Sequence, residues 1–287
     1  MSRMETPFPP FNPDGEPEEE NGTDGYASPR LRDIPLRTIF PNLLTLLAIC
    51  SGLTSIRFAV EEQISLAVGA IILAAFLDGI DGRVARFLKS TSRFGAQMDS
   101  LADFVNFGVA PAMLLYFTLL DGVRSFGWIA ALIYASCACL RLARFNVMLD
   151  MPDRPKWQNN FFVGVPAPAG AMTVLAPIYL HQLGLENSQS LDTFAAIYAV
   201  LIGLLMVSSL PTFSGKDMGK RVPREYVLPL LIVVVAFAGI LLSWPWETLS
   251  GLAFLYLAGM PFGYRAWQAH VSAEVEKSAE NQNQRSG

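Results

Sequence analysis

The chain has 287 residues, of which 52% are hydrophobic and only 16% are charged. This balance excludes an ordinary water-soluble domain and is typical of a protein with several membrane-spanning helices. The formal net charge of −4 comes mostly from an acidic N-terminal stretch, and we expect no nucleic-acid partner.

The two ends of the chain differ from its middle in composition. Residues 1–35 are rich in Pro, Glu, Asp, Asn and Gly, and residues 271–287 are also polar. Segments of this kind cannot bury enough apolar surface to offset the entropy lost on folding. We therefore expect a disordered acidic tail over 1–35, a membrane-embedded domain over 36–270 and a second disordered tail over 271–287.

Apolar windows of roughly 20 residues, long enough to cross about 30 Å of hydrocarbon, recur through the middle of the chain. Eight can be placed, near residues 38–60, 65–88, 97–119, 125–147, 161–184, 192–211, 226–244 and 248–268. The connections between them are short, which favours one compact bundle. The expected fold class is an all-α integral membrane protein with about eight transmembrane helices.

The Lys and Arg residues predict how this bundle is oriented, because they gather in cytoplasmic loops. They cluster before the first window and in every second connection after it, whereas the opposite side holds little beyond Arg57 and Arg124. Both termini are therefore expected in the cytoplasm, with the protein in the cytoplasmic (inner) membrane.

Four aspartates lie at the facing ends of the second and third windows. Asp78 and Asp81 are three residues apart and Asp99 and Asp103 are four apart, so each pair lies on one face of its helix. A short turn makes the two helices antiparallel neighbours, which brings both pairs together at the cytoplasmic interface. Carboxylates at membrane depth are costly and mark function. Divalent cations relieve their mutual repulsion, and oxygen-only ligands suit two Mg²⁺ or Mn²⁺ ions.

Small and basic residues around these aspartates indicate a phosphate ligand. Gly82 and Ala85 let a large ligand approach the helix backbone, and Gly95 allows close packing. Arg86 is placed to bind a phosphate through two hydrogen bonds. Packing alone is the plainer interpretation of an isolated glycine. The two histidines are not placed near the aspartates, and no G-x-S-x-G or P-loop pattern occurs. This leaves direct displacement at phosphorus, with a carboxylate accepting the proton of the nucleophile.

Residues 78–103 read Asp-x2-Asp-Gly-x2-Ala-Arg-x8-Gly-x3-Asp-x3-Asp. This pattern resembles, at every position, the motif of the CDP-alcohol phosphotransferase family, whose membrane enzymes exchange the CMP of a CDP-linked donor for an alcohol. The resemblance implies that Asp78, Asp81 and Asp99 bind one metal ion. It also implies that Asp78, Asp99 and Asp103 bind a second, and that Asp103 is the catalytic base.

The same resemblance implies which residues contact the nucleotide-diphosphate donor. They lie in the motif, in the turn within it, and at the head of the first helix, where Pro41-Asn42-x2-Thr45 is similar to another donor-contacting element of the family. The implied contacts are Asn42, Thr45, Gly82, Ala85, Arg86, Ser92 and Gly95. Family members pair as homodimers, and the resemblance implies the same here.

Two later stretches bear on the acceptor alcohol. Residues 141–147 and 161–168 look like those of the phosphatidylserine synthases of the family, which transfer the phosphatidyl group of CDP-diacylglycerol to L-serine. Arg141 and Arg144 could pair with the carboxylate of an amino-acid acceptor, and Asn106 is a further candidate contact. The two arginines fit positive-inside anchors equally well, and Asn106 fits an interhelical hydrogen bond.

Alternative functions stay open at this point. Within the family, a phosphatidylglycerophosphate, phosphatidylinositol-phosphate or phosphatidylcholine synthase would carry the same motif and differ in the acceptor pocket. A cation transporter would place its carboxylates near the bilayer midplane, often on broken helices. A transporter does not explain Gly82, Ala85 and Arg86.

Overall fold

The computed structural model describes residues 36–88, 92–149, 161–186, 188–208, 211–213 and 224–261. The expected tails over 1–35 and 271–287 lie outside these residues. The described elements, in chain order, are α1 (Leu36–Val60), α2 (Ile64–Phe87), α3 (Arg93–Asp103), the π-helix η1 (Phe104–Val109), α4 (Ala110–Thr118), the 3-10 helix η2 (Leu120–Val123), α5 (Arg124–Leu149), β1 (Phe161–Val163), α6 (Ala167–Val174), α7 (Ala176–Gln182), α8 (Gln189–Val207), β2 (Pro211–Phe213), α9 (Arg224–Ser243) and a last helix over 245–261.

Six stretches of the described chain are long and apolar enough to cross a membrane, and together they identify an integral membrane protein. They are Ile39–Val60, Ile64–Phe87, Phe94–Thr118, Leu120–Met148, Gln189–Val207 and Tyr226–Ser243. Large apolar side chains such as Phe76 and Leu101 are more than half exposed on the outside of the bundle. In water this would be unfavourable, whereas lipid chains solvate such a surface.

The fifth predicted window, 161–184, is not one continuous helix, so that prediction is wrong. It begins as strand β1, which pairs antiparallel with β2, with Phe161 opposite Phe213. Gly164 then adopts φ +77, a conformation that favours glycine, and Pro166 disfavours helix in the residue before it. The window becomes helical from Ala167, in two pieces, α6 and α7. The eighth window is helical over 245–261 within the described residues.

Small residues let the helices of the bundle pack closely. α1 packs along α2, and α5 packs along α8. At the second contact a Cβ added to Gly203 would lie 3.2 Å from the Cα of Tyr134, so a larger residue would crowd this approach. Phe107, Tyr134 and Tyr179 are the largest side chains that are fully buried in the core. This core fixes η1 and α5 behind the aspartate-bearing helix α3.

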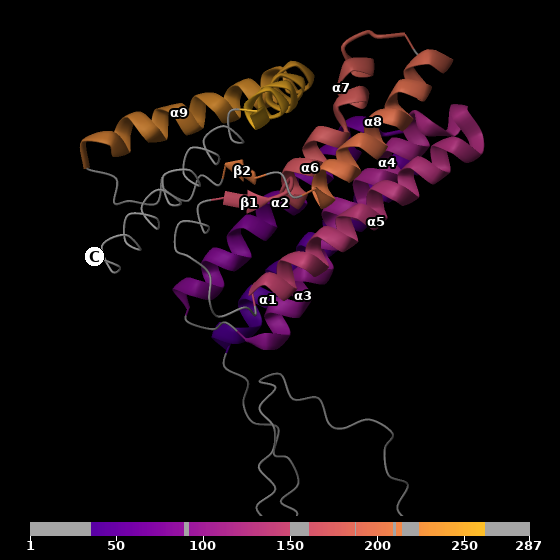
Figure 1. Cartoon of the computed structure of the whole chain (residues 1–287). Helices are drawn as coiled ribbons and strands as arrows, with labels where there is room; N and C mark the ends of the chain where they lie inside the picture. The colour runs from indigo at the N-terminus through magenta and orange to yellow at the C-terminus, as the bar shows by residue number, and fades with distance from the viewer. Residues whose placement is uncertain are drawn as a thin grey trace, which may run out of the picture.

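The C-terminal helices relate differently to the bundle. No residue in the apolar window of α9 is buried, and Figure 1 shows α9 lying beside the bundle rather than within it. The helix over 245–261 instead buries Leu249 and Ala253 in the core. The last helix is therefore part of the packed structure, and its residues can contribute to a site within it.

Candidate active site

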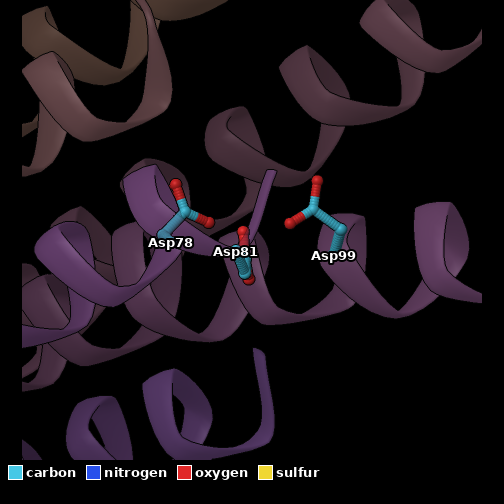
Figure 2. Close-up of side chains that lie close together, drawn as sticks. All are labelled: Asp78, Asp81 and Asp99. Atoms are coloured by element: carbon cyan, nitrogen blue, oxygen red, sulfur yellow. The ribbon is translucent and has the colours of Figure 1, made fainter. Parts of the chain in front are cut away.

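Three aspartates meet where α2 ends and α3 begins. Asp78 and Asp81 lie on consecutive turns of α2, and Asp99 lies on α3. One carboxylate oxygen from each lies within 4.8 Å of the others. Figure 2 shows Asp78 and Asp99 turned toward one another with Asp81 between them. Three oxygen donors at this separation, contributed by two helices, fit a hard divalent cation such as Mg²⁺ or Mn²⁺.

Helix α1 supports this cluster through Thr45. The Thr45 hydroxyl donates a hydrogen bond to Asp81 Oδ2 at 2.7 Å, and it also lies 3.2 Å from the carbonyl of Pro41. Both Thr45 and Asp81 are buried, with 4% and 3% of their surface exposed. A buried hydrogen bond of this kind holds the carboxylate in one orientation and leaves its other oxygen for a ligand.

The fourth aspartate, Asp103, lies one turn deeper along α3 and outside the three-carboxylate group. Its carboxyl group shares a hydrogen bond with that of Asp78 and interacts electrostatically with Asp99, and Arg141 supplies the opposing positive charge. Its Oδ1 is buried and has no hydrogen-bond partner among the described residues. An unsatisfied buried oxygen beside a cation site is a free acceptor for a proton or a substrate group.

The π-helix η1 begins directly after Asp103. Pro111 has no N–H with which to bond the Phe107 carbonyl four residues earlier, and the Tyr134 hydroxyl donates to that carbonyl instead, at 2.9 Å. Single π-helical turns occur frequently at functional sites. The bond ties α5 to the chain just beyond Asp103, and α5 also carries Arg141.

A pocket of about 200 Å³ opens beside the aspartates, between α1, α2 and α3. All seven residues that the family resemblance assigned to the donor line it: Asn42, Thr45, Gly82, Ala85, Arg86, Ser92 and Gly95. Pro41, Ala96, Asp81 and Asp99 complete the lining. The structure thus gathers residues from positions 41 to 99 of the chain around one cavity.

The two glycines of this pocket serve different purposes. A Cβ added at Gly95 would lie 3.2 Å from both Asn42 Oδ1 and Ser92 Oγ, so Gly95 permits α3 to approach α1. Ser92 caps α3 by accepting a hydrogen bond from the Gly95 N–H at 3.0 Å. A Cβ at Gly82 would meet nothing within 4 Å. Protein packing therefore does not require a glycine at 82, and the open space there favours ligand approach.

The three candidate acceptor residues differ in their surroundings. Arg141 is buried, its Nε has no hydrogen-bond partner among the described residues, and its guanidinium lies 5.9 Å from the centre of the Phe145 ring. Asn106 is fully buried on η1, and neither amide atom is partnered in the described part of the chain. Arg144 is exposed and donates to the Val207 carbonyl at 2.9 Å, which ties α5 to the end of α8.

Three further residues that shape the site are not among the predicted site residues. Gly52 on α1 is needed because a Cβ there would overlap the Asn106 side chain. Asn146 donates to Ser100 Oγ at 3.0 Å and so links α5 to α3 next to Asp99. Tyr256, on the last helix, lies close to Arg141. Asn146 lies in a stretch that the family resemblance had already singled out, whereas only tertiary packing brings Gly52 and Tyr256 here.

Comparison with known proteins identifies the same family as the one that the motif residues resemble. The family model for CDP-alcohol phosphatidyltransferase matches residues 38–209, and that for CDP-alcohol phosphatidyltransferase 2 matches residues 225–261. A CDP-diacylglycerol–serine O-phosphatidyltransferase of Mycobacterium leprae is 40% identical over 254 residues, which cover 88% of this chain and 84% of the relative.

More distant relatives show the same similarity. A CDP-diacylglycerol–serine O-phosphatidyltransferase of Helicobacter pylori is 34% identical over 221 residues, 76% of this chain and 88% of the relative. An archaetidylserine synthase of Methanothermobacter thermautotrophicus is 34% identical over 175 residues, 59% of this chain and 67% of the relative. The motif residues gather around one pocket, and the family model and these relatives match much of the chain. The chain therefore belongs to the CDP-alcohol phosphatidyltransferase family.

Proposed function

We propose that this protein transfers the phosphatidyl group of CDP-diacylglycerol to the hydroxyl of L-serine, giving phosphatidylserine and CMP. The observation that carries the proposal is the buried Arg141 beside Asp103, next to the pocket lined by the donor-contact residues. A proton acceptor and an anion-binding guanidinium at one place suit an acceptor with both a hydroxyl and a carboxylate. The names of the relatives support the same acceptor.

The donor diphosphate would bind at the acidic cluster. Asp78, Asp81 and Asp99 would hold one divalent cation, and Asp78, Asp99 and Asp103 a second, either Mg²⁺ or Mn²⁺; when bound, the cations offset the negative charge of the diphosphate. Arg86 lines the pocket with an exposed guanidinium available for a phosphate oxygen, and its Nε is fixed by the Gly82 carbonyl at 3.0 Å. The open space at Gly82 and Ala85 admits the nucleotide.

The reaction is a single displacement in which the residues position the acceptor and move its proton. Arg141 pairs with the serine carboxylate, and the Asn106 amide offers both a donor and an acceptor to its polar groups. Asp103 accepts the hydroxyl proton as the serine oxygen bonds to the phosphorus that carries diacylglycerol. The bond from that phosphorus to the CMP oxygen breaks, and CMP leaves with the electron pair. No covalent enzyme intermediate is required.

The assay that tests this function compares acceptors. Purified protein is given CDP-diacylglycerol and a divalent cation with serine, glycerol 3-phosphate, inositol phosphate or choline, and CMP release is measured for each. Of the four acceptors, we expect only serine to give CMP release. Release with another acceptor instead of serine would assign the protein to a different branch of the family, and labelled CMP that exchanges into the donor without serine would refute a single displacement.

We further propose the topology and domain limits that the sequence predicts. Besides the six described spans, the pair α6 and α7 and the helix over 245–261 make two further crossings of the cytoplasmic membrane. Both termini and the active site face the cytoplasm, and the protein is a homodimer. Labelling of single cysteines placed in the loops tests the orientation, and light scattering of the purified protein tests the dimer. Removal of residues 1–30 is expected to leave turnover intact, because the acidic tail carries none of the site residues.

A further inference from the structure

A groove of about 490 Å³ lies between α6 and the helix over 245–261. Ala169 and Met172 line it from α6, and Leu252, Tyr256 and Gly259 line it from the last helix. Its size lies within the range of ligand-binding pockets. The donor-contact residues line a separate cavity, so the groove is a second concave feature of the molecule.

The groove offers almost nothing to a polar ligand. Besides Tyr256, the only hydroxyl in its lining belongs to Thr173, which donates to the Ala169 carbonyl at 2.6 Å and is therefore already satisfied. The remaining lining residues are Ala, Met, Leu and Gly. An apolar groove in a membrane-embedded bundle suits a hydrocarbon chain.

The groove is connected to the reactive end of the site. Tyr256 lies in its lining and close to Arg141, which in turn lies close to Asp103. The other wall, α6, packs against η1, the turn that follows Asp103. A ligand whose phosphorus lies at the aspartates could therefore extend into this groove without leaving the protein surface.

We propose that this groove binds one acyl chain of the lipid donor. The proposal rests on the proposed function, because it assumes that the substituent next to the reacting phosphate is diacylglycerol. The carbon chains of that group must lie in the membrane, and the groove is an apolar surface whose lining includes Tyr256, close to Arg141. The last helix thereby contributes to donor binding, through residues that lie outside the motif.

Gly259 offers a way to fill the groove. A Cβ added there meets nothing within 4 Å, so the backbone leaves room for a side chain and Gly259→Phe adds bulk to the groove. The matched control is Gly251→Phe, because a Cβ at Gly251, on the same helix, also meets nothing and Gly251 does not line the groove. Both variants change the composition of the helix identically.

The measurement is the KM for the donor in detergent micelles, with dioleoyl and dihexanoyl forms of CDP-diacylglycerol. Gly259→Phe is expected to raise the KM of the dioleoyl donor about tenfold, since several methylene groups lose their apolar contacts. The KM values for the dihexanoyl donor and for serine should stay unchanged, and Gly251→Phe should match the wild type throughout. If Gly259→Phe does not fold, Gly259→Leu replaces it with the same expectations.

Other results would overturn the proposal. An unchanged dioleoyl KM in Gly259→Phe would mean that only bulk lipid covers the groove. A change in oligomeric state without a change in that KM would mean that a second copy covers it. An equal loss with both donors would indicate structural damage rather than a chain-binding site.

A photoreactive donor gives a test that does not depend on turnover. A CDP-diacylglycerol with a diazirine in one acyl chain should cross-link to residues 245–261 of the wild type, with long-chain donor as competitor, and less to Gly259→Phe. Cross-links found only elsewhere would refute the groove. Wild-type protein that cross-links there but releases no CMP with serine would refute the proposed acceptor and leave the groove standing.

Discussion

Both ends of the bundle bury an aspartate next to a pocket. At one end Asp81 joins Asp78 and Asp99 beside the donor pocket. At the other end Asp192, in the first turn of α8, borders a pocket of about 550 Å³ that is also lined by Arg124. Figure 1 shows α1 and α3 at one end of the bundle and the start of α8, next to α7, at the other.

The difference lies in how many elements converge. Asp192 has a local explanation, because a carboxylate in the first turn of a helix is stabilised by the helix dipole and this one packs against Gly122. The three-aspartate cluster has no such explanation: α2 and α3 bring like charges together, and Thr45 from α1 orients one of them. What distinguishes the active site from the single buried acid at the other end is therefore the convergence of carboxylates from two helices, one of them oriented by a third helix.

The largest effect is expected from Asp103→Asn, which keeps the shape of the side chain and removes the proton acceptor. The turnover number should fall by about a hundredfold to ten-thousandfold, the range of general-base catalysis. The initial rate of CMP release at saturating donor and serine measures it. A variant that works at full speed would show that Asp103 does not accept the proton.

Arg141→Gln tests the acceptor contact. It should raise the KM for serine by about tenfold to a hundredfold, because the free energy of a hydrogen bond to a charged group corresponds to an affinity change of this size. The KM for the donor should change little. Arg144→Gln is the matched control, since Arg144 is exposed and bonds only the Val207 carbonyl among its described contacts. It should lower thermal stability slightly and leave the serine KM unchanged. Equal serine KM values in the two variants would contradict the assignment.

Thr45→Val should weaken divalent-cation binding by about tenfold, because loss of a hydrogen bond that orients a ligand typically costs this much. Thr45→Ser keeps the hydroxyl and should restore binding. Thr54→Val is the control on the same helix, since the Thr54 hydroxyl only bonds the Cys50 carbonyl one turn back. Mn²⁺ titration followed by electron paramagnetic resonance reports the affinity without turnover. Normal affinity in Thr45→Val would show that Asp81 needs no support.

Gly82→Ala should raise the KM for the donor by about fivefold, because the added methyl group enters space that the ligand needs. Gly79→Ala, one turn earlier on α2, is the control: a Cβ there also meets nothing within 4 Å, and Gly79 does not line the pocket. Its donor KM should equal that of the wild type. Equal effects in both variants would indicate a change in α2 itself.

The smallest effect is expected from Asp192→Asn at the opposite end of the bundle. Turnover and Mn²⁺ affinity should both stay within about twofold of the wild type, with a modest loss of thermal stability from the weaker dipole interaction. A large loss of turnover would mean that this end of the bundle takes part in the reaction.

The acidic site could be predicted from the sequence because its spacing is local. A helix turns every 3.6 residues, so Asp78 and Asp81 share a face wherever α2 forms, and a short turn brings Asp99 close. The support from Thr45 and the reach of Tyr256 toward Arg141 depend on how α1 and the last helix pack, which no spacing reveals. Gly164 and Pro166 are local signals that the predicted helix over 161–184 is interrupted. Averaging the hydrophobicity over a window of about 20 residues hides them.

The proposed reaction depends above all on a divalent cation held jointly by Asp78, Asp81 and Asp99. Titration of the purified wild type, Asp99→Asn and Asp192→Asn with Mn²⁺, followed by electron paramagnetic resonance, tests whether these residues bind it. We expect Mn²⁺ to bind to the wild type and to Asp192→Asn, and binding to be lost in Asp99→Asn. Equal binding in all three proteins, or none in the wild type, would contradict it.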